Sequence, residues 1–185
     1  MSQMDFNLLY DCWRSLPRRA DSAAPSRKYL RPDSMIDFLP RVILNERLSR
    51  YELIQMLTGS QVEKALNFRM EGKNLFDLYE PGHEREILAD FVETLLEVPC
   101  GGRLVRSIQR PDGFTYTLST YHLPMENNEG QLNLLLGIAH VGVEQSERPY
   151  RDDESKFHFR LKSIEYIDIG RGTPRAKDSA SIKKS

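Results

Sequence analysis

The sequence predicts an α+β fold, in which helices pack over one face of a five-stranded antiparallel sheet and an N-terminal helix flanks that sheet. The first observation is the order of the apolar runs: two short ones lie between Arg41 and Gly59, a helical stretch follows, and three longer ones follow Pro99. The second is the turn sequences Pro111-Asp112-Gly113 and Asn127-Asn128-Glu129-Gly130, which separate the last three runs. Turn residues between apolar runs indicate hairpins, so the chain should form two strands, helices and a three-stranded meander.

The composition predicts a single globular domain with tails. A chain of 185 residues is long enough for one core, because domains of about 100 to 150 residues are the commonest size. The 26 basic and 27 acidic residues nearly cancel, which argues against a nucleic-acid groove or a polybasic membrane anchor. No segment approaches the ~18 apolar residues of a membrane-spanning helix, and no signal-peptide pattern is present. The sequence therefore predicts a cytoplasmic protein without nucleic-acid or membrane partners.

Residues 1–30 are predicted to form an amphipathic helix followed by a surface loop. Apolar residues recur at helical spacing, and Pro17 ends the pattern. A helix of this length is marginal alone, so its apolar stripe should dock either on the exposed face of the chain's own sheet or on the same helix of a second subunit. The candidate interface residues of this stripe are Phe6, Leu9, Trp13 and Leu16.

Residues 31–145 are predicted to form the sheet domain. Its first two strands are short, with Asn45 to Arg50 as the hairpin between them, and Gly59 ends the second. The clearest helix spans His83 to Val98, where glutamates suit the positive N-terminal end and Pro99 follows as a stop. An apolar stripe on this helix is expected to face the sheet; it consists of Ile87, Leu88, Phe91, Val92 and Leu95.

The last strand of the meander carries apolar residues on both faces. Leu134 and Leu136 share one face, while Leu135 and Ala139 share the other. This pattern indicates a central strand that is covered on both sides. Beyond it, residues 146–185 are predicted to form a charged linker, one further strand or ordered arm, and a disordered tail.

The sequence offers no constellation for catalysis or metal binding. The common motifs of hydrolases, metalloproteases and nucleotide-binding proteins are absent. Cys12 and Cys100 stand far apart and are predicted to be free, partly buried thiols. His83 has charged neighbours instead of the apolar cavity that haem needs, and His140 is predicted to be a hydrogen-bonded core or interface histidine. We therefore predict that the protein is not an enzyme and holds no cofactor or metal.

The candidate ligand site is an apolar cavity between the helices and the sheet. Its predicted lining consists of Met56, Phe68, Leu75, Phe91, Val105, Tyr121 and Leu135. A ligand there would also need polar partners, for which Gln55 and Tyr121 are the candidates. The alternative is that all of these residues are ordinary core, because protein interiors are closely packed.

Five segments of the chain together carry a family resemblance. They are LPRRAD from Leu16, RPDSMIDFLPRVIL from Arg31, LIQMLTGSQV from Leu53, FRMEGKNLFDLY from Phe68 and LLLGIAHV from Leu134. In this order and spacing they resemble the short, single-domain PAS proteins found mostly in alphaproteobacteria, over roughly residues 10 to 145. The resemblance implies a PAS-like sensory or regulatory module that acts through protein-protein contacts, as a homodimer or with a signalling partner, with a small apolar ligand as an optional modulator.

Two alternatives to this function remain at the level of the sequence. One is a structural adaptor that binds no ligand, and the other is a small enzyme or carrier built on a curved α+β sheet. In the regulatory interpretation, the expected contact surface is the solvent-facing side of the meander, where Arg103 is the main interface candidate beside Ser107, Thr117 and Ser119.

Overall fold

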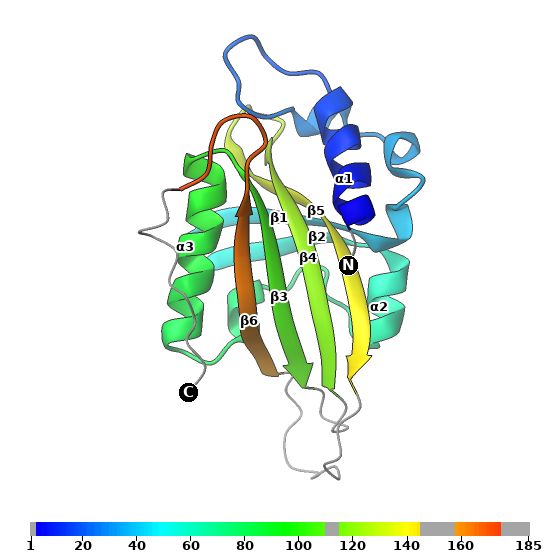
Figure 1. Cartoon of the computed structure of the whole chain (residues 1–185), viewed down its shortest axis with the longest axis vertical. Coiled ribbons are helices and arrows are strands. Elements are labelled where there is room, and N and C mark those ends of the chain that lie inside the picture. Colours follow the sequence, from blue (N-terminus) through cyan, green and yellow to red (C-terminus); the bar gives the residue numbers. More distant parts are fainter. Residues whose placement is uncertain (1–2, 110–114, 145–157, 175–185) are drawn as a thin grey trace.

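The computed structural model describes residues 3–109, 115–144 and 158–174, which form one antiparallel sheet with helices on both faces. The strands follow the order β2-β1-β5-β4-β3-β6 across the sheet. Their bounds are Val42–Ser49 for β1, Glu52–Thr58 for β2, Gly101–Gln109 for β3, Thr115–Glu126 for β4, Leu132–Glu144 for β5 and His158–Ile167 for β6. The predicted α+β class is confirmed, and Figure 1 shows the layers.

The sheet has six strands, whereas we expected five. β6 pairs antiparallel with β3 along its whole length, and its Phe159 and Leu161 are buried in the core. Alternation of apolar and polar residues lets β6 bury one side against the helices while the other faces solvent. The additional strand therefore extends the sheet beyond the predicted meander.

The hairpin between β1 and β2 is tighter than predicted. β1 continues through the segment that we assigned to the loop, because its pairing with β2 runs from Ile43 opposite Thr58 to Ser49 opposite Glu52. The turn is thus confined to Arg50 and Tyr51. As a consequence Asn45, which was expected in a loop, lies in a strand and is fully buried.

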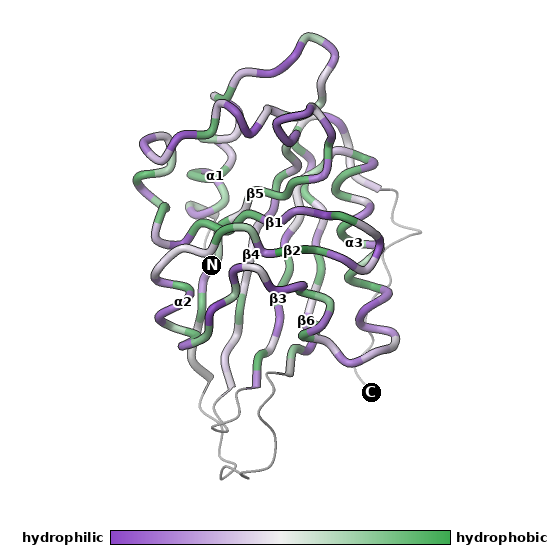
Figure 2. Tube along the Cα trace, turned by 180° about the vertical axis from the view of Figure 1, so that it is seen from behind, coloured by the Kyte–Doolittle hydropathy of each residue, from purple (hydrophilic) through white to green (hydrophobic). Residues whose placement is uncertain are grey.

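We call the sheet face covered by α2, η4 and α3 the inner face. α2 spans Ser60–Leu66, the 3₁₀ helix η4 spans Leu75–Leu78, and α3 spans His83–Glu97. The predicted stripe of α3 is buried in the inner core together with residues from β1, β3, β4 and β5. Along α3, apolar and polar positions alternate at helical spacing, as the tube in Figure 2 shows.

The opposite, outer face carries α1, which spans Gln3–Ser15. Its apolar side chains pack in a second core against Tyr121, Leu123 and Met125 of β4 and against residues of β1 and β5. Figure 1 shows α1 over one part of this face, beside β4 and β5. Three short 3₁₀ helices then lead to β1: η1 at Arg27–Tyr29, η2 at Pro32–Met35 and η3 at Leu39–Arg41.

The predicted central strand is confirmed, because β5 lies between β1 and β4 and contributes to both cores. The second predicted turn also forms: the side chain of Asn127 accepts hydrogen bonds from the backbone N–H groups of Glu129 and Gln131, and Gly130 adopts a positive φ of 85°. The turn predicted at residues 111–113, the linker at 146–157 and the tail from residue 175 lie outside the described residues.

Candidate functional site

A small cavity lies between the inner face of the sheet and α2. Its volume is about 10 Å³, which is close to the space that one water molecule needs. Polar side chains from four strands line it, namely Asn45 of β1, Gln55 and Thr58 of β2, Arg106 of β3 and Thr120 of β4. Its apolar wall includes Val62 and Leu66 of α2 together with Met70 and Leu75.

The pleat of the strands places the polar groups at this cavity. On β3, Leu104, Arg106 and Ile108 are buried, whereas the residues between them are only half-buried. Because side chains of a strand alternate between its two faces, Arg106 must enter the inner core with its two apolar neighbours. The same alternation brings Thr120 of β4 to the inner face between Leu118 and His122.

Arg106 is a buried cation with few hydrogen-bond partners. Its side chain is 3% exposed, its Nη2 donates to Thr120 Oγ1 at 3.2 Å, and its Nε has no partner. The guanidinium carbon lies 5.8 Å from the ring centre of Phe159. Within the described part of the chain, no ion pair includes Arg106. Its positive charge therefore has no carboxylate in ion-pair contact among the described residues.

His122 neither neutralises the positive charge of Arg106 nor adds a second one. The ring lies in the core with Nε2 2.8 Å from Thr120 Oγ1, and its Nδ1 has no hydrogen-bond partner. Burial, with a further contribution from the charge of Arg106, lowers the pKa of His122 to about 3. The imidazole is consequently neutral near pH 7.

Two further polar side chains at the cavity lack hydrogen bonds. Asn45 is fully buried, and neither its Nδ2 nor its Oδ1 has a partner; the same holds for Thr58 Oγ1. Gln55, by contrast, donates from Nε2 to the carbonyl of Leu57 at 2.7 Å. Buried amides and hydroxyls are normally hydrogen-bonded, so the inner face holds unused donors and acceptors beside a cation.

β6 and η4 close the site at the side of Arg106. Phe159 of β6 packs edge-on against Tyr79, with ring centres 5.6 Å apart. Burial raises the pKa of Tyr79, although the charge of Arg106 opposes that shift. The phenol is thus protonated near pH 7, and the ring of Phe159 contacts both Tyr79 and Arg106.

The predicted lining residues do not converge on this cavity. Leu75 lines it, whereas Phe91 and Leu135 belong to the surrounding inner core and Phe68 packs at that core's margin. Three predictions are wrong: Met56 is 39% exposed, Val105 lies half-buried on the outer side of β3, and Tyr121 packs beneath α1. In each case the strand register turns the side chain away from the inner face. Gln55 does line the cavity, as predicted.

The apolar stripe of α1 takes the first of the two predicted docking modes. Phe6, Leu9, Trp13 and Leu16 are all buried against the chain's own sheet. Trp13 Nε1 donates to the carbonyl of Pro124 at 2.6 Å, and the guanidinium carbon of Arg18 lies 4.4 Å from the Trp13 ring centre. The stripe is accordingly an intramolecular contact surface.

The outer face beyond α1 holds the remaining interface candidate, Arg103. Its side chain is 33% exposed, and its Nη1 lies 3.6 Å from Oε2 of Glu165 on β6. The guanidinium carbon is also 5.9 Å from the ring centre of Tyr121. Arg103 is therefore held flat on the sheet and is partly accessible.

The histidines and cysteines singled out in the sequence lie outside the cavity. His140 is exposed, so it is not a core histidine, and the predicted alternative of an interface histidine stays a prediction; His83 is exposed at the start of α3. Cys12 and Cys100 are free and more deeply buried than expected, and burial raises the pKa of both thiols, that of Cys100 to about 11. Residues 3–109, 115–144 and 158–174 contain no cluster of three or more His, Cys, Asp or Glu side chains suited to a metal ion.

Sequence reasoning missed Arg106, Asn45 and Thr120. A signal was present for the first, because Arg103 and Arg106 are three residues apart on one strand. Side chains at odd separations point to opposite faces, so one of the two arginines had to face the covered side. For Asn45 no such alternation could be recognised, because the residue was assigned to the hairpin loop and not to a strand.

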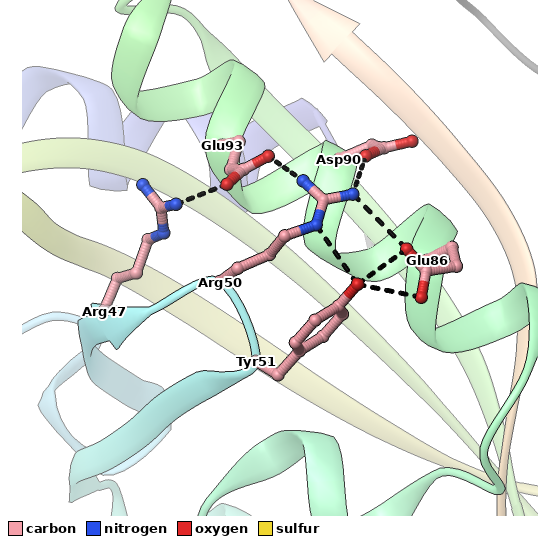
Figure 3. Close-up of polar contacts among 6 residues, drawn as sticks. All are labelled: Arg47, Arg50, Tyr51, Glu86, Asp90 and Glu93. Carbon is pink, nitrogen blue, oxygen red and sulfur yellow. Dashed lines mark hydrogen bonds and ion pairs between the residues drawn. The ribbon is translucent and has the colours of Figure 1, made fainter.

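A surface network of charges ties the β1–β2 hairpin to α3, as Figure 3 shows. Glu93 of α3 accepts hydrogen bonds from both Arg47 and Arg50. Arg50 Nη2 also donates to Asp90 Oδ1 at 2.7 Å, and the Tyr51 hydroxyl donates to Glu86 at 2.9 Å. These groups are paired with one another, which makes the network a structural link.

We expect Arg50→Gln to lower the thermal midpoint by only a few degrees at low ionic strength, because exposed ion pairs contribute little to stability. Salt should reduce the difference between the variant and the wild type, since about 1 M salt screens charges beyond about 3 Å. Thermal unfolding followed by circular dichroism at low and high NaCl measures both effects. A loss that is equally large at both salt concentrations would contradict an electrostatic role.

The described helices include none that is long and apolar enough to cross a bilayer. Comparison with protein families gives one finding: the family model of the PAS domain matches residues 1–140. Comparison with curated protein sequences gives no match. β6 lies beyond the matched residues, so it extends the sheet outside the region that the family model covers.

Proposed function

This chain belongs to the PAS domain family, and from that membership we propose that it is a regulatory module that acts through contacts with other proteins and turns over no substrate. PAS domains are generally sensory, non-enzymatic modules that commonly mediate protein interactions and dimerise. The family resemblance predicted from the sequence is thereby confirmed. A location in the cytoplasm stays a prediction of the sequence.

One observation supports the proposal above all others: the groups around the inner cavity can bind a ligand, whereas the hydroxyl of Thr120 has only the weakly basic His122 beside it. Asn45 and Arg106 offer unused hydrogen-bonding atoms. The imidazole of His122 is neutral and is buried at a fully enclosed position. A nucleophile needs an effective base within hydrogen-bond reach. The hydroxyl of Thr120 lies 2.8 Å from His122 Nε2, but the pKa of this imidazole is lowered to about 3, which makes it a weak base. Such a site suits recognition better than turnover.

The proposed partner surface is the part of the outer face that α1 leaves uncovered. Arg103, Val105 and Ser107 of β3 and Thr117 of β4 are half-buried there, with Arg103 at the margin beside Tyr121. Ser119, which was also expected on this surface, is buried. Figure 1 shows β6, β3 and β4 side by side in the sheet, viewed from the face that α1 partly covers. A partner would meet it without displacing α1.

Neutralising Arg103 is expected to weaken partner capture several-fold while leaving the fold intact, because a charge at the margin of an interface mainly affects encounter and specificity. Arg103→Gln is preferable to charge reversal, since Glu165 lies 3.6 Å away. Full-length protein serves as bait in extracts of the source cell, and captured proteins are identified and quantified by mass spectrometry. Arg69→Gln is the matched control, because Arg69 is 79% exposed and follows α2.

Equal capture of the same partners by wild type and Arg103→Gln would place the contact elsewhere. A reproducible hydrolase or transferase activity in the purified protein would contradict the regulatory proposal itself. Circular dichroism of each variant separates a lost contact from a lost fold.

A small ligand in the inner cavity is part of the proposal, and the polar lining favours a polar ligand over the apolar one expected from the sequence. The second candidate function is a ligand-free adaptor, which the cavity volume of about 10 Å³ favours. Native mass spectrometry of freshly purified protein separates the two. A mass that exceeds that of the chain by a bound small molecule supports a sensor. A mass equal to that of the chain alone supports an adaptor.

A further inference from the structure

Arg106 presents a charge that the described chain does not balance. Removing a cation from water costs several kcal/mol unless an anion or a full set of hydrogen bonds replaces the solvent. Among the described residues, the guanidinium donates a hydrogen bond to the neutral Thr120, interacts with the neutral phenol of Tyr79 and contacts the ring of Phe159. An arginine does not escape this cost by losing its proton, because guanidinium groups stay protonated in proteins.

The unpaired groups face the same small volume from different strands. Asn45 enters from β1, Thr58 from the end of β2 and Arg106 from β3, and all three line the cavity described above. Together they offer N–H and O–H donors around a positive charge. A guanidinium presents its donors as a planar fork that matches the two oxygens of a carboxylate.

We propose that this cavity binds the carboxylate group of a small organic acid, with Arg106 as its counter-ion and Asn45 and Thr58 as further hydrogen-bond partners. The inference rests on the proposed sensory function and names the chemistry of the ligand. It also accounts for the unused polar atoms, because a bound carboxylate would accept hydrogen bonds from Arg106 Nε, Asn45 Nδ2 and Thr58 Oγ1, each of which has no partner among the described residues.

The cavity must widen to admit such a ligand. Its present volume suits one water molecule, so the smallest carboxylates should enter most easily. The wall formed by α2 and Met70 is the part that can yield, because α2 is a single seven-residue helix that ends at Asn67 in a left-handed conformation. Val62 and Leu66 of α2 line the cavity, so a ligand that widens it would displace α2, and this displacement would carry the signal.

Sodium formate is the first probe, acetate the second, and sodium chloride at equal ionic strength is the reference. Full-length protein is titrated while its thermal midpoint and its arginine Nε–H resonances are followed by calorimetry and by ¹H–¹⁵N NMR. We expect formate to raise the midpoint progressively, as any ligand of the native state does. We also expect it to shift one slowly exchanging Nε–H signal that is absent from Arg106→Gln.

Arg106→Gln should reduce the affinity for formate by about tenfold or more, because hydrogen bonds to charged groups contribute about 1.5–3 kcal/mol. Arg69→Gln removes an exposed arginine and should leave the titration unchanged. Asn45→Leu provides a second variant in case Arg106→Gln does not fold. It replaces an unpaired buried amide by an apolar group of similar size, so it should stay folded and weaken the response to formate.

The outcomes decide the proposal. A formate-dependent shift of the Arg106 signal that chloride does not reproduce supports it. An equal response to chloride, a response that survives in both Arg106→Gln and Asn45→Leu, or no response of the wild type to formate or acetate overturns it. Partner capture by the outer face is measured separately, so loss of the carboxylate site would leave the regulatory proposal standing.

Discussion

Trp13→Ala is expected to lower the free energy of unfolding by about 3–5 kcal/mol, the range for truncating a buried large aromatic side chain. The indole is 3% exposed and lies in the outer core beneath α1. Its removal also leaves the carbonyl of Pro124 without the N–H donor at 2.6 Å. Both losses act on the same contact, which holds α1 to β4.

Urea or guanidinium unfolding followed by circular dichroism measures this loss. Met4→Ala is the control on the same helix, because Met4 is 68% exposed and should change stability very little. Since α1 docks within its own chain, Trp13→Ala should leave the molar mass in solution unchanged wherever the variant is folded. Unaltered unfolding of Trp13→Ala, or dissociation of a dimer without loss of stability, would contradict the intramolecular role of α1.

Gly137→Ala is the second substitution with a large expected effect. A Cβ at this position of β5 would lie 2.4 Å from the carbonyl oxygen of Tyr121 and 2.8 Å from Ile43 Cγ1. The first contact is with backbone, which cannot rotate away as a side chain does. We expect a loss of about 1–3 kcal/mol or more, the cost of overpacking a closely packed interior.

Gly142→Ala is the matched control, because it lies on the same strand and its added Cβ would meet only the carbonyl oxygen of Thr117 at 3.9 Å. Thermal unfolding of the two variants, compared with the wild type, isolates the effect of crowding from the general effect of Gly→Ala in a strand. Similar midpoints for Gly137→Ala and Gly142→Ala would show that the sheet accommodates the methyl group by a local shift.

The main elements could be predicted because their signals are local. The stripe of α3 repeats at helical spacing and Pro99 stops the helix, so its bounds were nearly correct. The two-sided apolar pattern of β5 likewise identified a central strand. β6 was harder, because a short alternating run does not reveal whether it will find a partner strand.

The candidate site could be predicted only in part. Gln55 and Leu75 were expected near a cavity and do line it. Met56, Val105 and Tyr121 were misplaced, because a shift of one residue in strand register exchanges the two faces of a sheet. The sequence shows the alternation along β3 but not which of its faces α3 covers.

The sequence by itself determined the α+β class, the family resemblance and the amphipathic nature of α1, because composition, periodicity and turn residues are properties of neighbouring positions. Only the tertiary structure decided that α1 packs on its own sheet, that β6 joins β3, and that Arg106 and Asn45 meet at one cavity. Asn45 and Arg106 are far apart in the chain, so nothing local encodes their proximity. It follows from the pairing of β1, β5, β4 and β3 across the sheet, which is set by packing between distant segments.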